Sequence, residues 1–211
     1  MKKFAVLSVL LLLISCAKEY DGETRLIFTS KVIDSGGNPV PNQLVTIEVT
    51  DVDDLDRISE GTTNQAGEIT FIFPAPHEET DKMYISISGS GFHDKLYANV
   101  TKADFVGYKL NLGDVTSFRL SEVVELRIDS NLATPNTSVT EVSIEGETVE
   151  NVVDYDPITD DFLSFPIMYH VLLDQTVVLH YTIRDNSTGI STQNAVDIPV
   201  ANQDITYVIN N

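Results

Sequence analysis

The chain has 211 residues, of which 42% are hydrophobic and 21% are charged, values typical of folded rather than disordered proteins. Its formal net charge is −19 at pH 7, and a surface this acidic repels nucleic-acid phosphates and anionic lipid headgroups. We therefore expect no nucleic-acid partner and no membrane binding through basic residues. The only cysteine is Cys16, so no disulfide can form within the chain.

The amino-terminal residues have the order of a secretory signal. Two lysines precede an apolar run, 4–14, which is too short to span a bilayer as a helix. The run is followed by the small residue Ser15 and then by Cys16, with Leu13 three positions before the cysteine. We predict a signal peptide over 1–15, cleaved between Ser15 and Cys16.

The four residues Leu13-Ile14-Ser15-Cys16 resemble the lipobox of bacterial lipoproteins. The resemblance implies that Cys16 carries several acyl chains, which together anchor a protein stably in a membrane. Residue 17 is not the aspartate of the usual inner-membrane retention signal, and the acidic run after it resembles the surface-export signals of Bacteroidetes-type lipoproteins. We predict a lipidated cysteine and tether over 16–23, in the outer membrane, on its periplasmic face or at the cell surface.

Residues 24–118 are predicted to form a β-sandwich of about seven short strands. Val45, Ile47 and Val49 alternate with polar residues, which is the pattern of a half-buried strand. Glycine-containing turn sequences separate the runs. Further strands are expected at 25–34, 69–73, 83–88, 96–100 and 108–112. No stretch has a convincing helical period.

Two motifs in this region resemble carboxypeptidase regulatory-like domains, which have a transthyretin-like sandwich fold. The first is Val32-Ile33-Asp34 with Gly37-Asn38-Pro39-Val40, and the second runs from Thr63 through Gly67 to Phe71. The segment 112–115 resembles the closing segment of the family, whereas Ser30 replaces a usual glycine. The resemblance implies a non-catalytic accessory domain in which Gly37 and Gly67 form tight turns and Ile69 and Phe71 lie in the core.

Residues 119–211 are predicted to form a second, immunoglobulin-like β-sandwich. Apolar residues alternate at 124–128, 142–144, 177–183, 196–200 and 205–209, with turns at 134–136, 154–161 and 185–189. No proline- or glycine-rich linker separates the halves, and 112–122 could be one continuous strand, so we expect a stiff tandem. The predicted fold class is therefore all-β, with two tandem sandwiches.

Two acidic clusters are candidates for calcium loops. The first, 51–56, places Leu55 and Asp56 where an EF-hand loop needs a ligand and a glycine. The second contains Asp154, Asp156, Asp160 and Asp161. We interpret both as solvated loops. His77-Glu78-Glu79-Thr80-Asp81 begins like a zinc-protease motif but lacks the second histidine, and it follows two prolines. We expect no metal site and no cofactor.

The sequence contains no catalytic motif that we recognise, so we expect no catalytic residues and no enzyme. Sugar-binding sandwiches stack glycans on aromatic rings, and the chain has no tryptophan. Tyr84, Tyr97, Tyr108 and Tyr169 are the remaining candidates for stacking. The predicted function is a non-catalytic interaction or structural module with an envelope protein partner. The alternative is a glycan-binding accessory protein in polysaccharide uptake.

Overall fold

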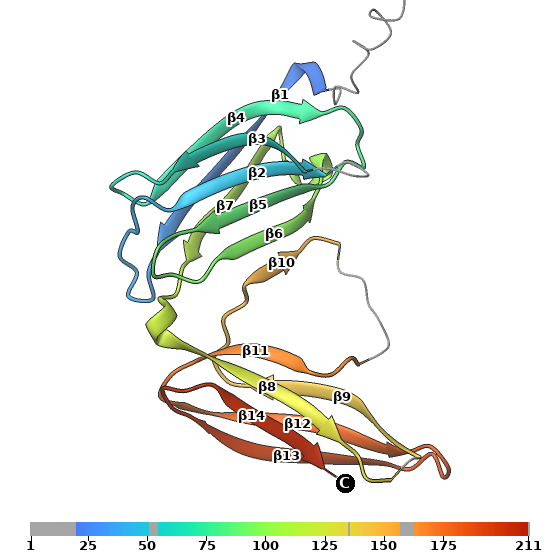
Figure 1. Cartoon of the computed structure of the whole chain (residues 1–211). Coiled ribbons are helices and arrows are strands. Elements are labelled where there is room, and N and C mark those ends of the chain that lie inside the picture. Colours follow the sequence, from blue (N-terminus) through green and yellow to red (C-terminus); the bar gives the residue numbers. More distant parts are fainter. Residues whose placement is uncertain (1–19, 51–54, 135, 157–162, 211) are drawn as a thin grey trace, which may run out of the picture.

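The computed structural model describes residues 20–50, 55–134, 136–156 and 163–210, and within these ranges the chain is almost entirely β (Figure 1). The strands are β1 Tyr20–Ile33, β2 Leu44–Thr50, β3 Leu55–Thr62, β4 Glu68–Pro76, β5 Met83–Ser88, β6 Lys95–Val100, β7 Lys109–Thr116, β8 Val123–Asn131, β9 Thr137–Glu145, β10 Val152–Asp154, β11 Ile167–Leu172, β12 Gln175–Asp185, β13 Ser191–Val200 and β14 Ile205–Asn210. Two 3₁₀ turns, η1 Lys102–Asp104 and η2 Leu120–Glu122, are the helical elements of these ranges.

The first sandwich consists of two sheets with the strand orders β4-β1-β7 and β10-β6-β5-β2-β3. The central strand β1 is antiparallel to β4 and parallel to β7. Every second residue of β2 and β5 points into the core, as the period of a strand requires: Val45, Ile47, Val49, Met83 and Ile85 are fully buried. The predicted core residues Ile69 and Phe71 are also buried, and Phe71 stacks on Phe28 with ring centroids 6.2 Å apart.

The second sandwich consists of the sheets β11-β8-β14 and β13-β12-β9. Its core contains Leu126 and Ile128 from β8, Val177 and Leu179 from β12, and Ile209 from β14, all completely buried. The last described strand, β14, lies parallel to β8 over six residue pairs. The all-β, β-sandwich class predicted from alternation is confirmed in both halves.

Three details differ from the sequence-based expectations. Strand β1 begins at Tyr20, so the second half of the predicted tether 16–23 belongs to a strand. Strand β3 starts at Leu55, within the first predicted acidic loop. The segment 112–122 is not one strand, because β7 ends at Thr116 and the η2 turn precedes β8.

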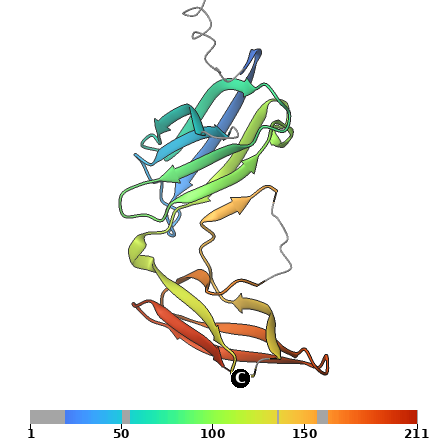
Figure 2. The same ribbon diagram turned by 45° about the vertical axis from the view of Figure 1, so that its right-hand side comes forward.

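The short strand β10 crosses from one sandwich to the other. It lies between β9 and β11 in sequence, yet it pairs in parallel with β6, with Val152 opposite Leu96, Val153 opposite Tyr97 and Asp154 opposite Ala98. Figures 1 and 2 both show β10 alongside β6, away from the sheets of the second sandwich. Sequence reasoning predicted a turn at 154–161 and no such strand. The predicted domain boundary between residues 118 and 119 stays a prediction. Strand β10 belongs in sequence to the second predicted domain but pairs with a strand of the first sandwich.

Candidate functional site

Several long-range polar contacts join the two sandwiches at the junction between them. The loop between β5 and β6 contacts the link between β7 and β8: His93 N–H donates to Phe118 O over 2.9 Å, and Leu120 N–H donates to Gly91 O over 3.0 Å. The Arg119 guanidinium lies 4.8 Å from the centre of the Phe92 ring, a cation–π distance. The covalent link is therefore held against the first sandwich.

A second connection is made by residues 147–156, which we call the strap. Its beginning is held by β11, because Val149 N–H donates to His170 O over 2.8 Å. Its end is held by β6, where Leu96 N–H donates to Asn151 O over 2.8 Å and Tyr155 N–H donates to Ala98 O over 3.0 Å. The strap thus ties the two sandwiches together at a point separate from the link at 117–122.

Side chains fasten the end of the strap. Asn99 Nδ2 donates to Asp154 Oδ1 over 2.6 Å, and Lys82 Nζ forms an ion pair with Asp156 Oδ2 at 3.0 Å. The hydrogen bond from Asn99, followed by the backbone N–H of Asp156, lowers the pKa of Asp154. The predicted second acidic cluster is therefore partly a fastening of the strap, while Asp160 and Asp161 lie outside the described residues.

Two histidines meet beside the strap. His93 comes from the first sandwich and His170 from β11 of the second, and their rings lie edge to face with centroids 5.3 Å apart. Burial, followed by the neighbouring His170, lowers the pKa of His93, whereas Asp94 acts in the opposite direction. Asn151 Nδ2 lies 3.2 Å from His170 Nδ1, and the Oδ1 atom of Asn151 is buried without a hydrogen-bond partner.

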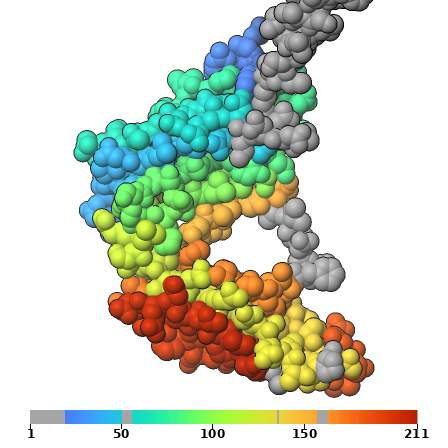
Figure 3. Space-filling model, viewed as in Figure 1, coloured from blue at the N-terminus to red at the C-terminus, as the bar shows by residue number. Residues whose placement is uncertain are grey.

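The strap is flanked by two open grooves. One, of about 690 Å³, is lined by strap residues 148–152 and by Met168, Tyr169 and His170 of β11. The other, of about 480 Å³, is lined by residues that include Phe92, His93, Leu120 and Asn151. Figure 3 shows the surface hollowed between the orange strap and the second sandwich. Grooves of this size at a domain junction are a common location for ligands.

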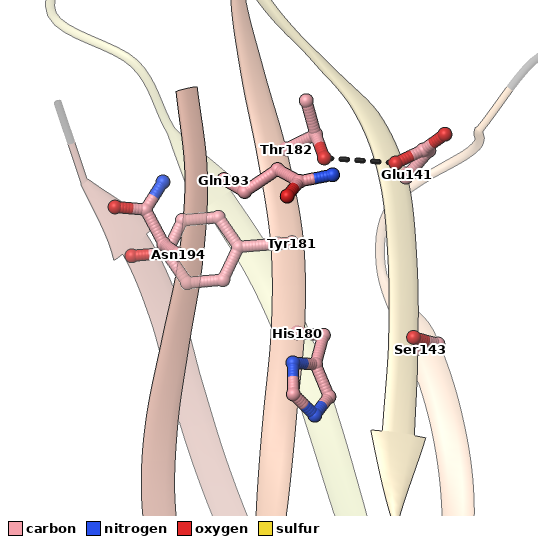
Figure 4. Close-up of a pocket in the computed structure, with 7 residues that line it drawn as sticks. All are labelled: Glu141, Ser143, His180, Tyr181, Thr182, Gln193 and Asn194. Carbon is pink, nitrogen blue, oxygen red and sulfur yellow. Dashed lines mark hydrogen bonds between the residues drawn. The ribbon is translucent and has the colours of Figure 1, made fainter. Parts of the chain in front are cut away.

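A separate polar pocket of about 260 Å³ lies on the sheet β13-β12-β9 (Figure 4). Cross-strand pairing brings Gln193, Thr182 and Glu141 side by side. Thr182 Oγ1 donates to Glu141 Oε2 over 2.8 Å, which holds the carboxylate in place. The remaining lining residues are Ser143, His180, Tyr181 and Asn194. This pocket offers carboxylate, amide and hydroxyl groups but no exposed aromatic platform.

The other predicted sites do not converge. Leu13, Ser15 and Cys16 lie outside the described residues, as do Asp51, Asp53 and Asp54. Asp56 accepts a hydrogen bond from the Tyr20 hydroxyl. Within the zinc-protease-like segment, Glu79 pairs with Lys102 at 2.9 Å and Glu78 N–H donates to Asp81. No three His, Cys, Asp or Glu side chains of the described ranges gather closely enough to hold a metal ion.

The four candidate tyrosines are scattered. Tyr97 is buried, and burial raises its pKa to about 12. Tyr84 is half-buried and donates to Asn99 Oδ1 over 3.2 Å, and Tyr169 is half-buried on β11. Tyr108 is 63% exposed. They form no shared stacking surface for a sugar.

Sequence reasoning missed the junction because its members are isolated in sequence. His93, Asn151 and His170 lie in three separate segments, and none has a neighbouring ligand at motif spacing. The part of the chain that the structure describes contains no helix suited to crossing a membrane.

No protein-family model matches the sequence, and no curated protein matches it. Among solved structures, a D295N mutant of the shaft pilin SpaA from Lactobacillus rhamnosus GG is 11% identical with a TM-score of 0.36, covering 88% of this chain and 98% of the pilin. The tip fimbrial protein Mfa3 from Porphyromonas gingivalis is 10% identical with a TM-score of 0.30, covering 82% of each chain.

A 9R-lipoxygenase from Cyanothece is 14% identical with a TM-score of 0.32, and the match covers 54% of this chain but only 20% of the enzyme. This chain likewise covers 34% of the TIE protein of Bacillus anthracis. At these TM-scores the likeness identifies neither a shared topology nor a shared function.

Proposed function

We propose that the chain is a lipid-anchored envelope protein whose two sandwiches form a stiff, non-catalytic module that presents a surface to an envelope protein partner. The observation that carries the proposal is the pairing of β10 with β6, because it gives the two sandwiches a second connection besides the link at 117–122. A tandem held at two points keeps its geometry when a partner binds, so less free energy is spent on ordering it.

The anchoring part of the proposal rests on the sequence Leu13-Ile14-Ser15-Cys16. The domains at 24–118 and 119–211, the carboxypeptidase regulatory-like resemblance of the first, the immunoglobulin-like character of the second and the outer-membrane location are parts of the same proposal. The non-catalytic part is supported by the scattering of the candidate residues outside the junction: Glu79 pairs with Lys102, and Asp81 and Asp185 accept backbone N–H groups.

Two experiments test the proposal. Cells that express the chain are labelled with a palmitate analogue, which we expect to mark the wild type and not the Cys16→Ser variant. Equal labelling of both would overturn the lipid anchor. Photo-crosslinking from residues on the groove, such as Met168, should capture an envelope protein in intact cells. The same probe at Ile190, which is 65% exposed on the far side of the second sandwich, is the control.

The polar pocket favours glycan binding as the second candidate. Glu141, Gln193 and Asn194 supply acceptors and donors that suit sugar hydroxyls, and the carboxylate is held by Thr182. Affinity electrophoresis in gels that contain polysaccharides should show retardation of the wild type and loss of retardation in Gln193→Ala. Unchanged mobility in every polysaccharide would rule this candidate out.

A further inference from the structure

Two histidine rings and one buried, unsatisfied amide oxygen meet where the strap crosses the junction. The ring of His93 makes no hydrogen bond or ion pair with any described residue. His170 uses Nδ1 toward Asn151, and its Nε2 has no partner within the described ranges. The Oδ1 atom of Asn151 is buried and unsatisfied. Buried polar atoms are nearly always satisfied, so the Asn151 oxygen needs an explanation, whereas the half-buried histidine rings are open to water from the grooves.

Rearrangement of the side chains does not remove the problem. If the side-chain amide of Asn151 is flipped, Oδ1 accepts a hydrogen bond from His170 Nδ1–H. The NH₂ group then occupies the position without a partner. His93 stays without a partner in both arrangements, because its ring meets the His170 ring rather than a carboxylate. The group that satisfies the buried Asn151 amide must therefore come from outside the described residues, as a water molecule or an ion.

The chemistry of the cluster selects the kind of ligand. Unprotonated imidazole nitrogens and an amide oxygen are lone-pair donors, and none of these groups is an anion that would need a basic partner. Imidazole nitrogen suits zinc, copper and nickel, with a metal–nitrogen distance of about 2.0–2.1 Å. Two nitrogens on one tetrahedral ion are then about 3.4 Å apart, which rings with centroids at 5.3 Å can reach by rotating.

The charges near the cluster are mixed, because the Arg119 guanidinium lies over the ring of Phe92, which precedes His93. Asp94 follows His93 directly, and Glu150 precedes Asn151 on the strap. Lys95 is the cation nearest in sequence, and its ammonium group is occupied by the Glu150 carbonyl oxygen. The grooves on both sides of the strap give an ion a path to the cluster.

We propose that His93 and His170 bind a divalent transition-metal ion that joins the two sandwiches at the strap, with Asn151 positioning His170: when Asn151 Oδ1 accepts a hydrogen bond from His170 Nδ1–H, the Nε2 atom of His170 is free to coordinate. One ligand comes from the first sandwich and one from β11, so a bound ion adds a third connection to the junction. Water molecules complete the coordination, because these residues supply two ligands. The proposal does not depend on the lipid anchor or on the identity of a partner.

The test is a calorimetric titration of ZnCl₂ into the chain without its predicted signal, at about pH 7.5, where imidazole is neutral. Cys16 is replaced by serine, because its thiolate would bind zinc independently. We expect one site per chain, weakened roughly tenfold or more by His93→Ala and by His170→Ala, and weakened less by Asn151→Ala. A thermal melt should show that zinc raises the melting temperature of the wild type.

His77→Ala and His180→Ala are the matched controls, since these exposed histidines lie away from the junction. Histidine-ring NMR provides a second readout if His170→Ala does not fold: zinc should shift the His93 and His170 ring protons and leave those of His77 and His180 in place. Zinc binding that is unaffected by His93→Ala, or no binding at millimolar zinc, would mean that water alone satisfies the cluster, and the proposal would fail.

Discussion

Asn99 Nδ2 donates a hydrogen bond to Asp154 Oδ1 across 55 positions of sequence and across the junction. Asn99 has a φ of +58°, a left-handed conformation that asparagine adopts more readily than most residues. It also accepts a hydrogen bond from Tyr84. Asn99, which lies at the irregularity in the pairing of β6 with β5, is thus the residue that fastens the strap.

Replacement of Asn99 should loosen the strap without unfolding the sandwiches. Asn99→Gly keeps the left-handed backbone accessible and removes the side chain, so the loss is that of the hydrogen bonds with Asp154 and Tyr84. We expect faster hydrogen exchange at 151–156 and a nearly unchanged melting temperature. Asn111→Gly is a comparison, because Asn111 bonds to Thr29 and Gly113, on β1 and its own strand. Equal protection of the strap in wild type and Asn99→Gly would contradict this role.

The histidine pair should make stability depend on pH. The folded pKa of His93 lies below its unfolded value, so the unfolded chain binds more protons in the window between the two. The contribution of neutral His93 to the free energy of unfolding is fully present above the unfolded pKa, and it is lost as the pH falls through the folded pKa. Urea unfolding at about pH 8 and about pH 5 should show a larger loss in wild type than in His93→Gln.

Asp94 provides the internal check on this pH dependence. Its charge partly stabilises the protonated form of His93, so Asp94→Asn should lower the pKa of His93 further and widen the window. His180→Gln is the control, because His180 faces Glu145 on the surface of the second sandwich. A pH profile that is the same for wild type and His93→Gln would show that the junction histidine does not titrate as described.

Two glycines with similar backbones should respond differently to alanine. Gly37 and Gly67 have φ values of +79° and +75°. A Cβ atom at Gly37 meets nothing within 4 Å, whereas at Gly67 it would lie 2.3 Å from Val32 O. Gly37→Ala should cost about 1–2 kcal/mol for the left-handed conformation alone. Gly67→Ala should cost more, because the backbone of β1 must also move, and chemical denaturation of the two variants measures the difference.

Truncation of a side chain in the core of the second sandwich should also change hydrogen exchange on β6 of the first sandwich. Leu126 is fully buried, so Leu126→Ala should lower the free energy of unfolding by about 2–5 kcal/mol. Since the strap belongs to the chain between β9 and β11, the Leu96 amide that donates to Asn151 O should exchange faster. Ile190→Ala, at an exposed position, should change the free energy of unfolding by no more than about 0.5 kcal/mol and should leave the exchange of the Leu96 amide unchanged.

The sequence could predict those strands whose side chains face a core on one side and solvent on the other. Val45, Ile47 and Val49 are an example, because burial imposes a period of two that can be read directly. Strand β3 was missed because it is an edge strand of mostly polar residues, held by backbone bonds to β2 rather than by apolar packing. The alternation of apolar and polar residues along the sequence does not reveal a polar edge strand of this kind.

The junction could not be predicted for a different reason. The strap is defined by where its backbone groups find partners, and those partners, Leu96 and Ala98, are more than fifty positions away. Val152 is 50% exposed although it is apolar, so β10 lacks the alternation of apolar and polar residues that indicates a strand. His93 and His170 are likewise brought together only by the packing of one sandwich against the strap of the other. Tertiary pairing, rather than local preference, creates both features.

The parallel pairing of β1 with β7 has a mechanical consequence. The amino-terminal end of β1 follows the proposed anchor in sequence, and the carboxyl-terminal end of β7 leads to the second sandwich. A pull between these points slides the two strands in opposite directions, so it loads the register from Ile27–Lys109 to Ile33–Thr116 in shear. Hydrogen bonds loaded in shear share the force, whereas bonds that unzip break one at a time. The arrangement suits a protein that resists tension while it remains tethered.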